Sequence, residues 1–255
     1  MRDSKRPAVP DLDEGLIEGR NAVTEAIKSG RIINKVFLAA GAIDHGLAHI
    51  GALAKEKGAV VVSVDRRKLD QMSPTGAHQG VIAMAAAHAY AAVQDLLDLA
   101  AARGEPPLLI LCDELSDPHN LGAILRTAEC AGAHGVVIPK RRSVGLTAVV
   151  AKASAGAVEY LPVARVTNLT AAIRELKEKG VWIFGADAAG ATLLHQADFR
   201  GPAAIVIGSE GGGMGRLVAE QCDFKISIPM KGRISSLNAS AAAAILLYEA
   251  VRQRG

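Results

Sequence analysis

The sequence predicts an α/β protein, in which a small N-terminal α/β domain is followed by a larger domain built on a parallel sheet. Three observations predict this class. Short apolar runs alternate with helical patterns along most of the chain. A hydrophobic fraction of 50% over 255 residues is enough for one large core or two smaller ones. A segment that closes with Gly104, Pro106 and Pro107 interrupts the pattern, because proline disfavours helix there.

The N-terminal α/β domain is expected over residues 14–88. Helices are predicted at 21–29, 44–57 and 66–72, and strands at 35–39, 59–64 and 80–86. Gly58 directly follows the second helix and is typical of a C-terminal glycine stop. Residues 89–106, which are helical in their middle, are interpreted as a linker.

The second domain is expected over residues 107–254. Its strands are predicted at 108–112, 135–138, 181–185, 203–207 and 224–228, and its helices at 118–131, 147–155, 169–179, 215–222 and 237–254. Asp117 is predicted to cap the first of these helices, with Pro118 in the first helical position. Uninterrupted apolar strands separated by helices are typical of a parallel sheet that is covered on both faces.

Three polar loops follow strands of this second domain, at 113–120, 208–215 and 229–236. Ligands of open parallel sheets bind beyond the carboxyl ends of the strands, so we expect polar chemistry to converge there. The glycines of the second loop permit close approach of the backbone to a ligand, and Glu210 stands among them. Ser236 and Asn238 precede the terminal helix, where they are either caps or part of a binding turn.

Several function classes lack their motifs in this chain. It contains no G-x-G-x-x-G, no Gly-Lys pair of a phosphate loop, no H-E-x-x-H and no G-x-S-x-G. His45 and His49 lie four residues apart without a nearby cysteine or carboxylate, so we expect surface histidines and no metal site. The longest stretch without charged residues, 71–94, contains Pro74 and two histidines, so no membrane span is expected.

The cysteine content and the net charge bear on the cellular compartment and on the binding partners of the protein. The three cysteines are far apart and residues 1–15 are polar, which favours a cytoplasmic protein with reduced thiols. A net charge of +3 and an aromatic fraction of 3% do not by themselves indicate a nucleic-acid partner. The basic clusters at 66–68, 140–142 and 231–233 are either solvated faces or phosphate contacts.

Three ordered segments resemble the SpoU branch of the SPOUT methyltransferases. They are DPHNLGAILRTA at 117–128, IGSEG at 207–211, and IPM at 228–230 together with SLNAS at 236–240. The N-terminal domain, with GRNAV at 19–23, resembles the ribosomal-protein-L30-like domain of the subgroup that acts on ribosomal RNA. The resemblance implies a homodimer with a deep trefoil knot in each second domain. It also implies methyl transfer from S-adenosylmethionine to a ribose 2′-hydroxyl of RNA, most simply a guanosine of 23S rRNA.

The resemblance further implies which residues form the site. The backbone of Gly208, Ile228 and Leu237 would hold the adenosyl group, and the polar active-site positions are Asn120, Arg126, Glu210, Ser236 and Asn238. A guanidinium pKa above about 12 makes Arg126 a poor proton acceptor, so we expect it to clamp a phosphate of the RNA. The alternative for Arg126 is an exposed ion pair with Glu129. Asn120 and Ser236 would orient the ribose, while Asn238 and Glu210 would fix the loop and Arg126.

Other functions are compatible with the same residues. A tRNA or an antibiotic-target RNA could be the acceptor for a ribose methyltransferase of this family. A non-catalytic RNA-binding or ribosome-assembly factor could keep the fold, although the presence of all five polar positions argues against it. A metabolic enzyme with an ordinary nucleotide-binding sheet is disfavoured, because the phosphate-binding fingerprints are absent. A cofactor-binding titration distinguishes an enzyme from a binding factor.

Overall fold

The computed structural model describes residues 15–41, 44–86 and 88–255, and it divides into two compact units. The first unit comprises Met1–His88 together with Leu146–Lys152, and the second comprises Ala89–Gly145 and Ala153–Gly255. Residue 14, where we predicted the first domain to start, lies outside the described residues, as does most of the polar segment 1–15. In the described ranges, no helix is both long enough and apolar enough to cross a membrane.

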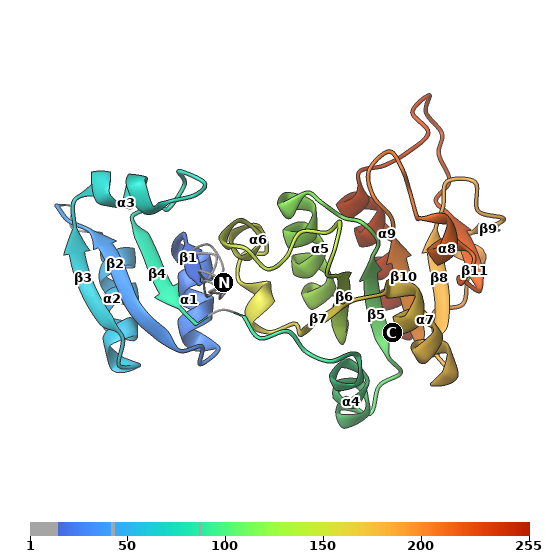
Figure 1. Ribbon diagram of the computed structural model, residues 1–255, viewed down its shortest axis with the longest axis horizontal. Helices are drawn as coiled ribbons and strands as arrows, with labels where there is room; N and C mark the ends of the chain where they lie inside the picture. The colour runs from blue at the N-terminus through green and yellow to red at the C-terminus, as the bar shows by residue number, and fades with distance from the viewer. Residues whose placement is uncertain (1–14, 42–43, 87) are drawn as a thin grey trace, which may run out of the picture. The chain divides into compact units, whose positions relative to one another are not determined.

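The first unit contains a four-stranded sheet in the order β1-β4-β2-β3 (Figure 1). Its strands are β1 (Leu16–Glu18), β2 (Ile33–Ala39), β3 (Val60–Val64) and β4 (Val81–Ala85), and its helices are α1 (Arg20–Lys28), α2 (His45–Glu56) and α3 (Arg66–Met72). β2 and β3 are parallel, whereas β4 pairs antiparallel with both β1 and β2. Val23 and Ile27 of α1 and Ile50 of α2 pack into one core with Val36 of β2. Strand β1 was not predicted, because it has only three residues.

The second unit contains a seven-stranded sheet in the order β7-β6-β5-β10-β8-β11-β9, and all its neighbouring strands are parallel. The strands are β5 (Leu108–Cys112), β6 (Gly135–Pro139), β7 (Val163–Val166), β8 (Trp182–Ala186), β9 (Thr192–Leu193), β10 (Ala203–Ile207) and β11 (Phe224–Ser227). The five strands predicted from apolar runs are present. β7 and β9 were missed, because Arg165 interrupts the first and the second has only two residues.

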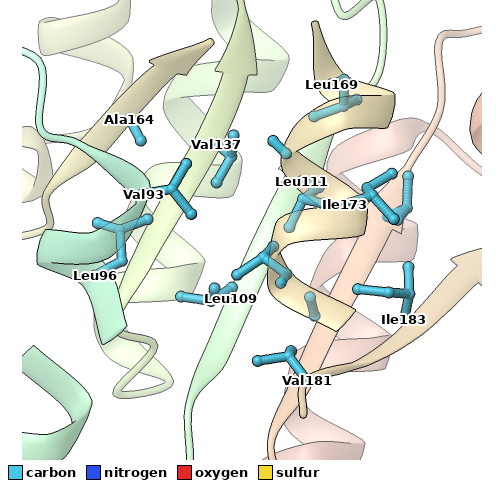
Figure 2. Packing of buried hydrophobic residues seen from close by; sticks show 14 of the residues in the cluster. Val93, Leu96, Leu109, Leu111, Val137, Ala164, Leu169, Ile173, Val181 and Ile183 are labelled. Atoms are coloured by element: carbon cyan, nitrogen blue, oxygen red, sulfur yellow. The ribbon is translucent and has the colours of Figure 1, made fainter. Parts of the chain in front are cut away.

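Helices cover both faces of this sheet. They are α4 (Val93–Arg103), α5 (Pro118–Cys130), α7 (Leu169–Glu178), α8 (Arg216–Ala219) and α9 (Ala239–Arg254), with short 3₁₀ helices η1 (Ala157–Glu159) and η2 (Leu194–Gln196). Helix α6 (Ala148–Ala153) belongs almost entirely to the first unit. Leu96 of α4 and Ile173 of α7 share a core with Leu109 and Leu111 of β5 (Figure 2). Ile110 alternates with these leucines and therefore points to the other face. α9 contacts α5 and β10, while the knot implied by the resemblance stays a prediction.

Residues 89–106 are not the linker that we predicted. α4 fills most of this segment, and its side chains Val93 and Leu96 are buried in the same core as the central strand β5. The backbone amide of Ala91 also donates to the Val163 carbonyl at 2.9 Å. Apolar residues at helical spacing explain this burial, because they give α4 one face to place against the sheet. The segment therefore belongs to the second unit.

Candidate active site at the carboxyl edge of the second sheet

A cavity of about 690 Å³ lies beyond the carboxyl ends of β8, β10 and β11. Its lining consists of residues 186–188, 207–214 and 235–239, with Ala219, Ile226, Ile228, Met230 and Ala242. Parallel strands end at the same edge, so loops that are far apart in the sequence meet there. Of the loops predicted to converge, 208–215 and 229–236 both line this cavity, and the three predicted cofactor residues Gly208, Ile228 and Leu237 are in the lining.

The glycine-rich loop after β10 folds back on itself. The amide of Ser209 donates to the Gly213 carbonyl at 2.9 Å, and the amide of Gly213 donates to the Ser209 carbonyl at 3.0 Å. A Cβ atom at Gly208 would lie 2.2 Å from the carbonyl carbon of Gly213 and 2.3 Å from the nitrogen of Met214. Two backbone segments therefore approach so closely that only glycine fits at position 208.

Asn120, Glu210 and Asn238 come together from three separate loops or helix starts. Asn120 Nδ2 donates to Glu210 Oε1 at 2.9 Å, and Asn238 Nδ2 donates to the same oxygen at 2.6 Å. Asn238 Nδ2 also donates to Asn120 Oδ1 at 2.9 Å. Asn120 is buried, whereas Glu210 and Asn238 are exposed. In the described part of the chain Glu210 Oε2 accepts no hydrogen bond, so this oxygen is available to a bound molecule.

Helix-start geometry fixes two members of this trio. Asn238 is the N-cap of α9, and its Oδ1 accepts from the amides of Ser240 at 2.9 Å and Ala241 at 3.2 Å. Asn120 lies in the first turn of α5, which is capped by Asp117 through the amide of His119 at 3.0 Å. The capping role that we considered for Asn238 thus exists, and the other end of its side chain still reaches the site.

Arg126 and Ser236 do not join these hydrogen bonds. Ser236 lines the cavity and is exposed. Arg126 is exposed on α5, six residues after Asn120, and it is not in the cavity lining. Over the residues described, Arg126 makes neither the predicted contact with Glu210 nor the alternative ion pair with Glu129. Its guanidinium is therefore open to solvent.

Two carboxylates of the site were missed, although both directly follow a strand. Asp113 follows β5, and its Oδ2 accepts from the Gly215 amide at 2.7 Å, which ties the end of the glycine-rich loop to the central strand. Burial raises the pKa of the Asp113 carboxyl above its ordinary value, and the hydrogen bond from Gly215 opposes this shift. Asp187 follows β8 and lines the cavity. Their place at strand ends was the signal in the sequence, because ligands bind at such ends.

Two of the three cysteines are poor nucleophiles, and the described residues contain no metal-binding cluster. Cys112, Cys130 and Cys222 are free thiols. Burial raises the pKa of Cys112 to about 12 and that of Cys222 to about 11, so both stay protonated at neutral pH and are poor nucleophiles. The described ranges also hold no group of three histidine, cysteine, aspartate or glutamate side chains placed to bind a metal ion.

Known protein families match both units of the chain. The profile of the SpoU rRNA Methylase family matches residues 107–248, and that of the substrate-binding domain of RNA 2′-O ribose methyltransferases matches residues 16–91. Among relatives, YacO of Bacillus subtilis is assigned to the TrmH family of tRNA/rRNA methyltransferases. It is 52% identical over 236 residues, which cover 92% of this chain and 94% of YacO.

Solved structures agree with these matches. The SpoU methyltransferase AviRb of Streptomyces viridochromogenes, in complex with S-adenosylmethionine, superposes with a TM-score of 0.80 at 27% identity, over 94% of this chain and 89% of AviRb. A crystal structure of an RNA 2′-O ribose methyltransferase superposes with a TM-score of 0.77 at 27% identity, over 94% of this chain and 88% of that chain. The chain therefore belongs to the SpoU methylase family and is an RNA methyltransferase that uses S-adenosylmethionine as its methyl donor.

Proposed function

We propose that the protein methylates the ribose 2′-hydroxyl of a guanosine in 23S rRNA, as a cytoplasmic homodimer with a trefoil knot in each second domain. The observation that carries the proposal is the joining of Asn120, Glu210 and Asn238 beside a glycine-lined cavity. The match to a substrate-binding domain of 2′-O ribose methyltransferases supports a ribose oxygen as the acceptor. YacO is assigned to a tRNA/rRNA methyltransferase family, so tRNA is the alternative acceptor.

The cavity lining fits S-adenosylmethionine. Its volume of about 690 Å³ lies within the range of about 300–1,000 Å³ that small-molecule sites occupy. Ile226 and Ile228 supply apolar surface for an adenine ring, and the glycine-rich loop supplies backbone groups that no Cβ shields. We assign the backbone of Gly208, Ile228 and Leu237 to the adenosyl group. When bound, the cofactor supplies an electrophilic methyl group on a sulfonium centre.

The protein residues then orient the acceptor. We assign Asn120 and Ser236 to the ribose, because they lie in or next to the lining at the edge where the three polar loops meet. Glu210 keeps both asparagine amides in place through one carboxylate oxygen. Arg126 holds a phosphate of the RNA, and an oxygen of that phosphate or another group takes the proton that the hydroxyl releases. Such positioning supplies much of the rate enhancement in a group transfer between two bound partners.

A basic loop after β6 supports RNA binding at the same edge of the sheet. Arg142 Nη1 donates to Glu114 Oε1 at 3.0 Å, and the amide of Val144 donates to the Leu115 carbonyl at 2.9 Å. These contacts hold the loop against the segment that leads from β5 to α5. The side chains of Lys140 and Arg141 make no hydrogen bond or ion pair with the described residues and are exposed. They are therefore free to bind phosphates, which set the position of an RNA rather than its sequence.

The acceptor RNA is tested by incubating the protein with labelled S-adenosylmethionine and, separately, with 23S rRNA and tRNA transcripts. Mapping the labelled nucleotide then identifies the target. Label on a 23S guanosine supports the proposal, and label confined to tRNA contradicts it. Binding of both cofactor and RNA without transfer would favour the non-catalytic alternative.

Gly208→Ala is expected to weaken S-adenosylmethionine binding at least about 100-fold, or about 2.8 kcal/mol. The new Cβ would overlap the backbone of Gly213 and Met214, so the loop must open. Isothermal titration calorimetry measures the affinity, and circular dichroism checks the fold. The matched control is Gly232→Ala, because nothing lies within 4 Å of a Cβ at Gly232. Unchanged affinity in Gly208→Ala would show that this loop does not hold the cofactor.

A fragment of residues 89–255 is expected to bind S-adenosylmethionine but not to methylate RNA, because it lacks the first unit. A fragment that starts at residue 105 also lacks α4, whose Val93 and Leu96 are buried in the core. We expect this shorter fragment to be less stable by more than about 3 kcal/mol, since burying each large side chain contributes about 2–5 kcal/mol. Urea unfolding of both fragments tests this, and equal stability would place α4 outside the cooperative core.

A further inference from the structure

Asp187 is a carboxylate in the cavity that the chemistry described so far does not use. Its Oδ1 accepts from the Ala189 amide at 2.9 Å, and its own amide donates to the Ile226 carbonyl at 2.9 Å. The backbone of Asp187 is therefore fixed to β11, and one carboxylate oxygen is fixed in a turn. Among the described residues, no group donates a hydrogen bond to the other oxygen, Oδ2. One oxygen of a fixed carboxylate is thus available inside a ligand cavity.

The charges of the cavity limit what this oxygen can bind. The described lining contains two charged residues, Asp187 and Glu210, and it contains no lysine, arginine or histidine. A carboxylate accepts hydrogen bonds and does not donate them. The part of the ligand that faces Asp187 must therefore be a donor, which in S-adenosylmethionine means the two ribose hydroxyls, the adenine amino group or the ammonium group.

The strand order places Asp187 away from the reacting atoms. β10 lies between β5 and β8 in the sheet. Asp187 follows β8 on one side of β10, whereas Asn120 follows β5 on the other side. Neighbouring strands are about 4.8 Å apart, which separates the ends of β5 and β8 by about 10 Å. The methyl group must reach the RNA next to Asn120 and Glu210. Asp187 therefore faces a part of the cofactor that lies several bonds from the methyl group.

The position of Asp187 relative to the glycine-rich loop favours the ribose hydroxyls. In parallel-sheet nucleotide sites, the glycine-rich loop follows one strand, and an acidic residue near the end of the neighbouring strand binds a ribose hydroxyl. Here the glycine-rich loop follows β10, and Asp187 follows β8, which pairs with β10 in parallel. We propose that Asp187 accepts hydrogen bonds from the ribose diol of S-adenosylmethionine and makes the pocket specific for a ribonucleoside. This proposal rests on the assignment of the cavity to the cofactor.

The test is a set of calorimetric titrations without RNA, with S-adenosylhomocysteine and its 2′,3′-dideoxy form as probes. The wild-type protein is expected to bind the ribose form at least about tenfold more tightly, since hydrogen bonds to charged groups are strong. Asp187→Asn keeps an Oδ1 for the Ala189 amide but removes the charge. It is expected to weaken S-adenosylhomocysteine binding by about five- to tenfold and to leave the dideoxy form nearly unchanged.

Two further titrations separate a contact to the diol from a contact to the ammonium group and from a general effect of the lost charge. 5′-Methylthioadenosine keeps the diol but lacks the ammonium group, so Asp187→Asn should weaken it by the same factor as S-adenosylhomocysteine. Asp198→Asn is the matched control and should change neither affinity. Asp198 also accepts the amide two residues ahead, from Arg200 at 3.0 Å, but it lies outside the cavity lining.

Two outcomes would overturn the proposal. Equal weakening of S-adenosylhomocysteine and its dideoxy form, with 5′-methylthioadenosine unchanged, would assign Asp187 to the ammonium group. Equal weakening of all three probes would assign it to the adenine amino group or to holding its loop. Because no RNA is present, a protein that failed to methylate 23S rRNA would leave this result untouched. A wild-type protein that bound neither probe would instead overturn the cofactor assignment of the cavity, and the role of Asp187 with it.

Discussion

Arg126→Ala is expected to lower the single-turnover rate of methyl transfer by about 100- to 1,000-fold, which is the usual effect of removing one group that stabilises a transition state. The affinity for S-adenosylmethionine should change by less than about twofold, since Arg126 is outside the cavity lining. Its guanidinium is exposed and has no partner within the described ranges. No internal ion pair has to break before it binds an RNA phosphate. Rapid-quench measurements at saturating RNA report the rate, and calorimetry reports the affinity.

Two other variants test whether Arg126 acts through its guanidinium group and whether the effect is specific to this arginine. Arg126→Lys keeps the positive charge but loses the planar two-pronged donor, so it should recover only part of the rate. Arg174→Ala removes another exposed arginine of the second unit, which donates to Gln221 at 3.2 Å, and it should leave the rate unchanged. If Arg126→Ala transferred methyl groups at the wild-type rate, Arg126 would be a solvated surface residue, and the phosphate would need another clamp.

Much of the fold could be predicted because the second sheet is built from continuous apolar strands. The predicted segments 108–112 and 203–207 coincide with β5 and β10, whose residues are all buried. Such runs mark strands because both faces of a parallel sheet are covered. The 89–106 segment was misjudged because its Gly and Pro residues were given more weight than the apolar spacing of α4. Local breakers indicate where a helix ends, but they do not show which core the helix packs against.

The site could be predicted only in part, because its contacts join residues that are distant in the sequence. Parallel-strand topology predicts that the three polar loops meet, and Asn120 does reach Glu210, 90 positions away, and Asn238, 118 positions away. No local pattern specifies those hydrogen bonds, and the roles of these residues came from a family resemblance. Asp113 and Asp187 were missed because an aspartate after a strand is also typical of an ordinary turn.

A 2′-deoxynucleotide at the mapped position of the RNA is expected to abolish methyl transfer to that nucleotide. This substitution removes the proposed nucleophile and keeps every phosphate that Arg126, Lys140 and Arg141 could bind. Because one neutral hydrogen bond contributes about 0.5–1.5 kcal/mol, RNA affinity should fall by about tenfold at most. The measurement is single-turnover transfer at saturating RNA, with the modified nucleotide identified by mass spectrometry.

The matched control carries the 2′-deoxy sugar at the neighbouring nucleotide, where phosphate spacing and local folding change in the same way. Transfer to the mapped ribose should persist there at close to the unmodified rate. A hydroxyl that only helps binding would produce a defect that higher RNA concentration relieves, whereas loss of the nucleophile persists at saturation. Continued transfer to the deoxynucleotide would make a base atom the acceptor. The assignment of Asn120 and Ser236 to the ribose would then have to be withdrawn, although the cofactor cavity and the role of Asp187 would stand.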